Sequence, residues 1–132
     1  MRISIYLIAL ALPAAVFTGS AHAATAQEQL ANFTAQAGVG PDSARGEQFF
    51  TGKHGHEWSC SSCHGPVPTT PGQHAGTGKV IKPMAPAFNP ERFTDAAKSE
   101  KWFRRNCRDV VGRECSASEK ADVLAWLLTL RP

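Results

Sequence analysis

Cys60-Ser61-Ser62-Cys63-His64 is the stretch that decides the fold of this chain. It has the form C-x-x-C-H, which is the attachment motif of a c-type haem. Residues three apart share one face of a helical turn, so Cys60 and Cys63 can both reach the vinyl groups of one porphyrin. His64 lies on the same face, where its imidazole can bind the iron as proximal ligand. The motif therefore predicts one covalently bound haem c.

A C-x-x-C pair has two other common uses, as a disulfide and as half of a zinc site. Structural zinc usually takes four ligands, often from two such pairs. The remaining cysteines, Cys107 and Cys115, are eight positions apart and do not form a second pair of this kind. Haem is therefore favoured, and a zinc-stabilised interaction module stays as the alternative outside haem chemistry.

The first 23 residues have the pattern of a secretory signal peptide. A positive start at Arg2 precedes an apolar run over residues 3–17, and small residues stand at Ala21 and Ala23, where a signal peptidase reads them. The run is shorter than the roughly 20 residues of a membrane span. We expect cleavage after Ala23, with Ala26 as second choice and an uncleaved anchor as the alternative.

Cleavage would leave one domain over residues 24–132, in keeping with the length of the chain. Bacterial haem c is attached outside the cytoplasm, so we expect a periplasmic protein without stable membrane insertion. Thiols can also pair oxidatively there. The formal net charge of the whole chain is only +3, which gives no argument for binding nucleic acid.

Four segments have helical patterns, and together they predict an all-α fold. They are 25–37, 43–50 after the cap Asp42, a stretch from the cap Thr94 that includes Trp102, Phe103 and Asn106, and the segment opened by the capping box Ser116–Glu119. Between them, residues 51–92 hold 12 Gly or Pro among 42 positions, too many for long regular elements. Such a segment is a poor core by itself, but wrapped around a haem it gains the apolar mass of the porphyrin.

Gly46 stands inside the second of these segments, where glycine costs about 1 kcal/mol against alanine. The sequence Arg45-Gly46-Glu47-Gln48-Phe49-Phe50 resembles the opening helix of class I cytochromes c. In those proteins a small residue lets the first and last helices cross closely. We expect such a crossing at Gly46, with fraying of the helix as the alternative.

The second axial ligand of the iron determines the function. A methionine closes the site for electron transfer, whereas a weak ligand leaves the iron open to small molecules. Met84 is flanked by prolines, as axial methionines often are. Asn106 could be a second ligand, but asparagine is also a common cap at a helix C-terminus. Next to it, Cys107 and Cys115 could form a disulfide worth about 2–3 kcal/mol, or remain free thiols.

Several blocks of the chain occur in an order that resembles the sphaeroides haem protein family, an unusual branch of class I cytochrome c. They are Cys60-Ser-Ser-Cys-His64-Gly65, Thr77-Gly78-Lys79, Pro83-Met84-Ala85-Pro86, Arg92-Phe93-Thr94-Asp95, Lys101-Trp102, Arg105-Asn106-Cys107, Gly112-Arg113-Glu114-Cys115 and Glu119-Lys120-Ala121-Asp122-Val123-Leu124. The resemblance covers nearly all of the mature chain, and the Arg-Asn-Cys block with its second cysteine is its most specific part. It implies a class I cytochrome c fold of about four to five short helices around one haem.

The resemblance also implies roles for individual residues. Asn106 would be the sixth ligand, and Cys107 and Cys115 would form the disulfide. Family members are high-spin, bind oxygen or nitric oxide when reduced, and are thought to exchange electrons with a dihaem cytochrome. An amide oxygen is a hard, weak donor that suits ferric better than ferrous iron, so reduction should release Asn106.

Met84 is the rival ligand, and it defines the alternative function. A His64/Met84 pair would make a low-spin electron-transfer cytochrome that binds no gas. In ordinary class I cytochromes c the ligand loop comes later, where this chain has 106–115. We therefore expect Met84 to contact the haem as a core residue, since Met fills irregular gaps well.

The remaining charged and titratable residues give weaker indications. Five basic residues cluster near Asn106 and form either a solvated face, a docking face for an acidic redox partner or counter-ions to the haem propionates. They are Lys101, Arg104, Arg105, Arg108 and Arg113. His54 and His56 are expected in exposed loops, and His74 could approach the distal side. The sequence has no evident acid–base pair, and reduction of oxygen or nitric oxide at the haem is the enzymatic alternative to simple electron transfer and ligand binding.

Overall fold

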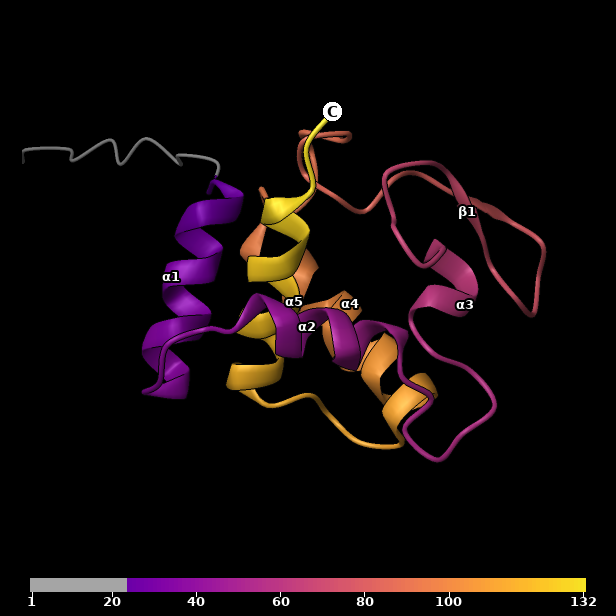
Figure 1. Cartoon of the computed structure of the whole chain (residues 1–132), viewed down its shortest axis with the longest axis horizontal. Coiled ribbons are helices and arrows are strands. Elements are labelled where there is room, and N and C mark those ends of the chain that lie inside the picture. Colours follow the sequence, from indigo (N-terminus) through magenta and orange to yellow (C-terminus); the bar gives the residue numbers. More distant parts are fainter. Residues whose placement is uncertain (1–23) are drawn as a thin grey trace, which may run out of the picture.

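The computed structural model describes residues 24–132, and the expected signal peptide lies outside them. Within the described residues the chain forms five helices and one two-stranded hairpin (Figure 1). The helices are α1 (Ala26–Ala37), α2 (Ser43–Thr51), α3 (Ser61–His64), α4 (Ala96–Val111) and α5 (Ala117–Thr129). The strands are β1 (Gly72–Gln73) and β2 (Val80–Ile81), which pair antiparallel. The predicted all-α class is confirmed. The short hairpin was not predicted, because no alternation of apolar and polar residues marks its strands.

Side-chain caps fix where the four longer helices begin, whereas α3 has none. Ser116 and Glu119 form the predicted capping box at α5, and Asp42 caps α2 by accepting from the Arg45 N–H at 3.0 Å. The predicted cap of α4 is wrong by one residue. The Thr94 hydroxyl donates to the carbonyl of Glu91 at 2.9 Å, and the Asp95 carboxylate accepts from the first turn instead. An ionised carboxylate only accepts hydrogen bonds, whereas a threonine hydroxyl can also donate one, which suits the carboxylate to this role.

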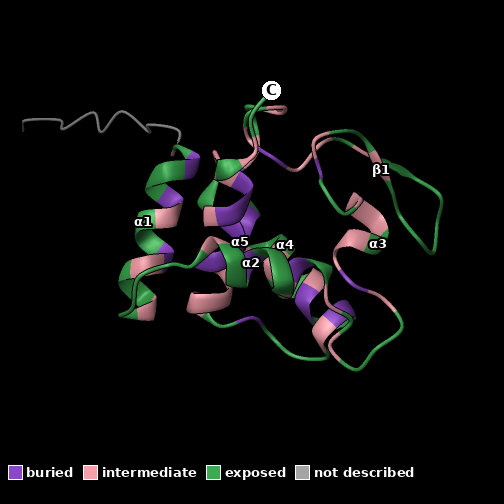
Figure 2. Cartoon of the chain, viewed as in Figure 1, coloured by how far each residue is buried: buried purple, intermediate pink, exposed green. Residues whose placement is uncertain are grey.

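The core forms where α1, α2 and α5 meet, as Figure 2 shows by the purple faces of these helices. Phe50 is fully buried and packs against Trp126, with ring centroids 5.0 Å apart. Asp122 of α5 is only 4% exposed, and it accepts two hydrogen bonds from the Arg45 guanidinium at 2.6 and 2.8 Å. This ion pair ties the start of α2 to the middle of α5.

Gly46 lies at the crossing of α2 and α5. A Cβ built on Gly46 would overlap the carbonyl group of Asp122 and stand 2.9 Å from the backbone nitrogen of Val123. Both neighbours are backbone atoms of a packed helix, so they cannot turn aside as a side chain would. The predicted close crossing is confirmed, and it offsets the propensity cost of a glycine in a helix.

The long segment between α2 and α4 carries α3 and the hairpin on the side of the molecule away from α1 (Figure 1). Within residues 52–92, only Ser59, Pro68 and Ala85 are buried. The segment therefore has almost no core of its own, as its glycine and proline content predicted. Among residues 24–132 no helix is long and apolar enough to cross a membrane.

Gly46→Ala should destabilise the haem-loaded protein by about 1–3 kcal/mol, the usual cost of overpacking a close contact. Unfolding by guanidinium chloride, followed by circular dichroism, measures the change. Gly40→Ala is the matched control, because a Cβ at Gly40 meets nothing within 4 Å. Equal stability of both variants would show that the helices do not cross as closely as described.

A candidate haem site

The C-x-x-C-H motif is presented by α3 and the turn that precedes it. Cys60 stands at the N-cap, and its carbonyl accepts from the His64 N–H at 3.1 Å, which closes one helical turn. Both cysteines are free thiols. Burial raises the pKa of the Cys60 thiol to about 11, so the sulfur is protonated at neutral pH. The motif therefore offers two unpaired sulfurs and one imidazole from a single turn.

His64 is held as a neutral base. Burial, with a smaller contribution from the positive charge of Arg92, lowers the pKa of His64 to about 4. The Phe50 ring lies behind it, with ring centroids 6.1 Å apart. A neutral imidazole with an available electron pair is the form that binds a metal.

Two adjoining cavities open beside the motif. The cysteine-side cavity has a volume of about 300 Å³ and is lined by Cys60, Cys63 and His64 together with residues of the hairpin and α4. The Met84-side cavity has a volume of about 440 Å³ and continues along α4 past Phe103. Both share a wall, which is formed by Ile81, Arg92, Trp102 and Asn106.

Asn106 lies in the interior of α4, five residues before the helix ends at Val111. The interpretation of Asn106 as a C-terminal cap is therefore wrong, and Gly112, with a φ of 75°, takes that place. The half-buried Asn106 side chain lines both cavities and makes no hydrogen bond to any other residue of 24–132. It is a polar group without a partner on the wall that faces the motif.

Met84 lies differently from Asn106. It lines the Met84-side cavity but not the cavity that holds Cys60, Cys63 and His64. Its backbone N–H donates to the carbonyl of Pro68 at 3.0 Å, and its side chain packs against the main hydrophobic core. The structure thus brings Asn106 and His64 to one cavity and leaves Met84 in the next.

A haem fits the residues that surround these cavities. The two thiols are unpaired, the imidazole is neutral, and one amide lacks a partner. The segment 52–92 also has almost no buried residues of its own, so a large apolar group would supply the mass that it lacks. Within the part of the chain described, no three His, Cys, Asp or Glu side chains are grouped to hold a metal ion, so the zinc hypothesis finds no ligand set.

The other histidines divide between the surface and the cavity. His54 was expected to be exposed but is half-buried, because its ring packs at a tilt against Phe49, with ring centroids 4.3 Å apart, and its Nε2 lies 2.8 Å from the Phe49 carbonyl. The exposed His56 lies against Gly112. Neither lines the cysteine-side cavity or the Met84-side cavity. His74 lines the cysteine-side cavity, and its Nδ1 accepts hydrogen bonds from the backbone N–H groups of Gly76 and Thr77, both at 3.2 Å.

Sequence reasoning did not single out two residues of the site. Trp58 and Arg92 both line the cysteine-side cavity. Trp58 stands two residues before Cys60, so an aromatic residue close to the motif was the available indication. Arg92 opens one of the blocks that carry the family resemblance, but neither that resemblance nor periodicity or spacing gave it a role in the site.

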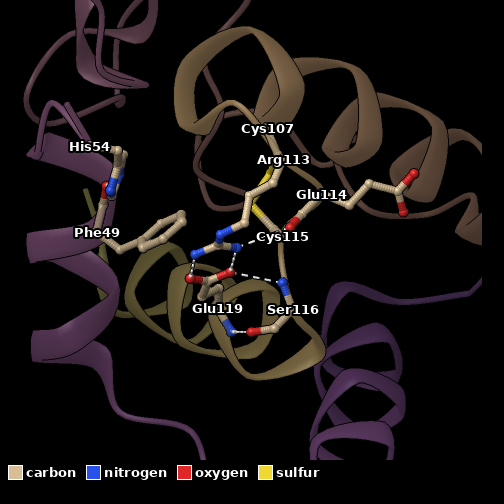
Figure 3. A network of polar contacts seen from close by, with 8 residues as sticks. All are labelled: Phe49, His54, Cys107, Arg113, Glu114, Cys115, Ser116 and Glu119. Atoms are coloured by element: carbon tan, nitrogen blue, oxygen red, sulfur yellow. Dashed lines mark hydrogen bonds and ion pairs between the residues drawn. A yellow bond between two sulfur atoms is a disulfide. The ribbon is translucent and has the colours of Figure 1, made fainter. Parts of the chain in front are cut away.

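A disulfide and an ion-pair network hold the segment that follows Asn106 (Figure 3). Cys107 of α4 and Cys115 are joined by a disulfide, with Cα atoms 5.7 Å apart. Arg113 donates two hydrogen bonds to Glu119 at 2.6 and 2.8 Å, and the same carboxylate accepts from the Ser116 N–H. Together these contacts tie the end of α4 to the beginning of α5.

The cluster of five basic residues expected near Asn106 divides into two groups. Arg108 pairs with Glu114 at 2.6 Å, and Arg113 pairs with Glu119. The other three have no carboxylate partner among the described residues, and they are exposed on α4: Lys101, Arg104 and Arg105. The Arg105 guanidinium lies 5.7 Å from the ring centroid of Trp102, which is 43% exposed.

A small helical fold whose single C-x-x-C-H turn opens on a cavity of this kind defines a monohaem c-type cytochrome. Comparison with known proteins shows that the chain belongs to the sphaeroides haem protein family. Residues 36–127 match the family model described as "Domain of unknown function (DUF1924)". The chain is 48% identical over 119 residues to the cytochrome c-type protein SHP of Cereibacter sphaeroides. The aligned region covers 86% of this chain and 92% of SHP.

Two solved structures have the same fold. The structure of oxidized SHP, described as an oxygen-binding cytochrome c, has a TM-score of 0.73 at 44% identity and covers 81% of this chain and 98% of its own. The solution structure of Methylophilus methylotrophus cytochrome c'', described with insights into haem-ligand detachment, has a TM-score of 0.70 at 38% identity and covers 81% and 94%. The predicted class I cytochrome c fold and the cofactor, one covalently attached haem c, are confirmed.

Glu119→Gln should weaken the fold at neutral pH but not in acid. The Arg113 hydrogen bond holds the pKa of Glu119 below its ordinary value of 4.5. A carboxylate with a lowered folded pKa stabilises the protein above pH 4.5, and this contribution disappears as the pH falls through the folded pKa. Because the pair is partly exposed, the difference should stay below about 1 kcal/mol.

Denaturant unfolding of wild type and Glu119→Gln at pH 7 and pH 3 measures this difference. Glu47→Gln is the control, because Glu47 is exposed and forms no ion pair with another described residue. A Glu119→Gln deficit that is equally large at both pH values would contradict the electrostatic origin.

Proposed function

We propose that this protein is a periplasmic monohaem cytochrome that accepts electrons and binds O2 or NO at a high-spin haem, with His64 as proximal ligand and Asn106 as a weak sixth ligand that is released on reduction. One observation carries this proposal. Asn106 lines the cavity of Cys60, Cys63 and His64, and Met84 does not.

Haem supplies an iron that changes oxidation state and takes a diatomic ligand where a coordination position is open. The amide oxygen of Asn106 is a hard, weak donor, which favours ferric over ferrous iron. No hydrogen bond to another described residue competes for this amide. The disulfide at Cys107 holds the adjacent backbone, so release needs only a rotation of the Asn106 side chain.

The relatives support the same function. The SHP structure is described as that of an oxygen-binding cytochrome c, and the cytochrome c'' structure concerns detachment of a haem ligand. The expected signal peptide over residues 1–23 and the disulfide between Cys107 and Cys115 both agree with a periplasmic location, since disulfides persist in oxidising compartments.

Met84 supports the second candidate, a low-spin electron-transfer cytochrome with His64 and Met84 as ligands. The Met84-side cavity shares its wall with the cysteine-side cavity, so a thioether there is near the site. The two candidates differ in one measurable respect, because methionine ligation closes both axial positions in both oxidation states.

Asn106→Ala should alter the ferric absorption and electron paramagnetic resonance spectra, and Met84→Leu should not. Asn106→Ala lacks the amide ligand, so cyanide should bind its ferric form at least about tenfold faster than it binds ferric wild type. This factor corresponds to about 1.4 kcal/mol of activation free energy. Stopped-flow absorption measures this rate.

Asn32→Ala is the matched control, because Asn32 lies on the exposed surface of α1. The proposal fails if Asn106→Ala keeps the wild-type spectrum while Met84→Leu turns a low-spin ferric haem into a high-spin one. That pair of results would assign the ligand to Met84.

Electrons would come from an acidic redox protein. In this family the expected partner is a dihaem cytochrome. We define the α4 basic face as the exposed residues Lys98, Lys101, Arg104 and Arg105. None of them has a carboxylate partner within residues 24–132, and Trp102 reaches from this face to both cavities. Positive charge beside an exposed aromatic residue steers and orients an acidic partner.

Lys101→Glu should slow electron uptake from an acidic dihaem cytochrome by about tenfold at low salt, since steering contributes factors of 10–10³. The difference should shrink as ionic strength rises. Stopped-flow reduction measures the rate, with Arg131→Glu as a charge-matched control at the exposed C-terminus and dithionite as a small reductant. Equal rates for wild type and Lys101→Glu at all salt concentrations would rule out this docking face.

A further inference from the structure

Arg92 is a cation on the wall that the two cavities share. It stands on the loop that precedes α4 and lines the cysteine-side and the Met84-side cavity. Its Nε donates to the Pro83 carbonyl at 3.0 Å, and its Nη2 donates to the Lys82 carbonyl at 2.8 Å. These two bonds fix the guanidinium plane, and Nη1 has no acceptor among the described residues.

The positive charge of Arg92 is not neutralised by the described part of the chain. Three carboxylates line the two cavities, and none of them forms an ion pair with Arg92. Asp109 lines the cysteine-side cavity, whereas the other two line the Met84-side cavity and are engaged elsewhere. Glu91 forms an ion pair with Lys82, and Asp95 caps α4. The guanidinium is half-buried, and burial lowers the pKa of Arg92. A half-buried cation of this kind is costly unless an anion is close to it.

The orientation of a haem can be derived from its attachment. The two vinyl groups of the porphyrin stand on adjacent pyrroles, and the two propionates stand on the opposite pair. Thioethers to Cys60 and Cys63 would hold the vinyl edge of a haem in the cysteine-side cavity. The propionate edge would then lie on the side away from the cysteines, where the Met84-side cavity is lined by residues that include Lys82, Arg92 and Lys98.

We propose that Arg92 is the counter-ion of a haem propionate, with Nη1 as the free donor. Lys82 and Lys98 are exposed, so water screens them, whereas the half-buried guanidinium faces the cavity from a fixed position. This proposal rests on haem attachment through Cys60 and Cys63, which the proposed function also requires. It does not depend on whether Asn106 or Met84 is the sixth ligand.

Arg92 is a positioning residue with an electrostatic effect on the iron. A cation that offsets a propionate favours the reduced haem, which carries one positive charge less than the oxidised form. Arg92→Gln should therefore shift the one-electron reduction equilibrium at least tenfold toward the oxidised protein, which lowers the reduction potential by about 59 mV. Arg92→Lys keeps the charge and should retain a potential close to that of wild type.

Mediated spectroelectrochemical titration of the haem-loaded protein measures these potentials. Arg131→Gln is the matched control, an exposed arginine outside both cavities. Infrared difference spectra with haem labelled with 13C at the propionates give a second readout. A labelled carboxylate band should move in Arg92→Gln and stay in Arg131→Gln.

Two results would overturn the proposal. In the first, Arg92→Gln leaves both the potential and the labelled carboxylate band unchanged. In the second, Arg92→Lys lowers the potential as much as Arg92→Gln does, which would mean that Arg92 only anchors the loop through Pro83 and Lys82. Failure of the gas-binding function would leave both readouts intact, since neither requires a ligand at the open position.

Discussion

The close approach of α2 and α5 at Gly46 is the constraint on which the site depends. It brings Phe50 against Trp126 on one side and toward His64 on the other, so the His64 ring lies beside the same residue that fills the core. Arg45 and the buried Asp122 tie the two helices at this crossing. The hydrophobic core is thus built mainly from α1, α2 and α5, and the segment between α2 and α4 surrounds the cavities where the haem would bind.

The segment 52–92 and the cavity wall formed by α4 contribute different groups to the site. The segment presents two thiols and an imidazole but contributes almost no buried residues, which explains how a chain of this size can fold around a group larger than any side chain. On α4, Asn106 faces the cavity without a hydrogen bond to another described residue, while the next residue, Cys107, is fixed by its disulfide. A rigid backbone with a free side chain suits a ligand that is bound in one oxidation state and released in the other.

Much of this could be predicted from the sequence, because the informative residues act locally. The C-x-x-C-H spacing, the capping box at Ser116 and the glycine in α2 each report a contact within one turn or one helix crossing. What could not be predicted depends either on which of two neighbouring residues ends or caps a helix, or on contacts between distant segments. The role of Asn106 as an interior residue of α4, rather than its cap, follows from where Gly112 ends the helix. The cap at Asp95 depends on a Thr94 bond to Glu91. The place of Arg92 between two cavities has no sequence pattern at all.

The central claim is that reduction opens the iron at the position of Asn106. Carbon monoxide binding to the dithionite-reduced, haem-loaded protein tests it most directly, followed by flow mixing and optical absorption. The proposed function predicts a high-spin ferrous spectrum that converts fully to the carbon monoxide form in a single fast phase. A low-spin ferrous spectrum that persists under saturating carbon monoxide would contradict it, because a methionine would then hold the sixth position in the reduced state.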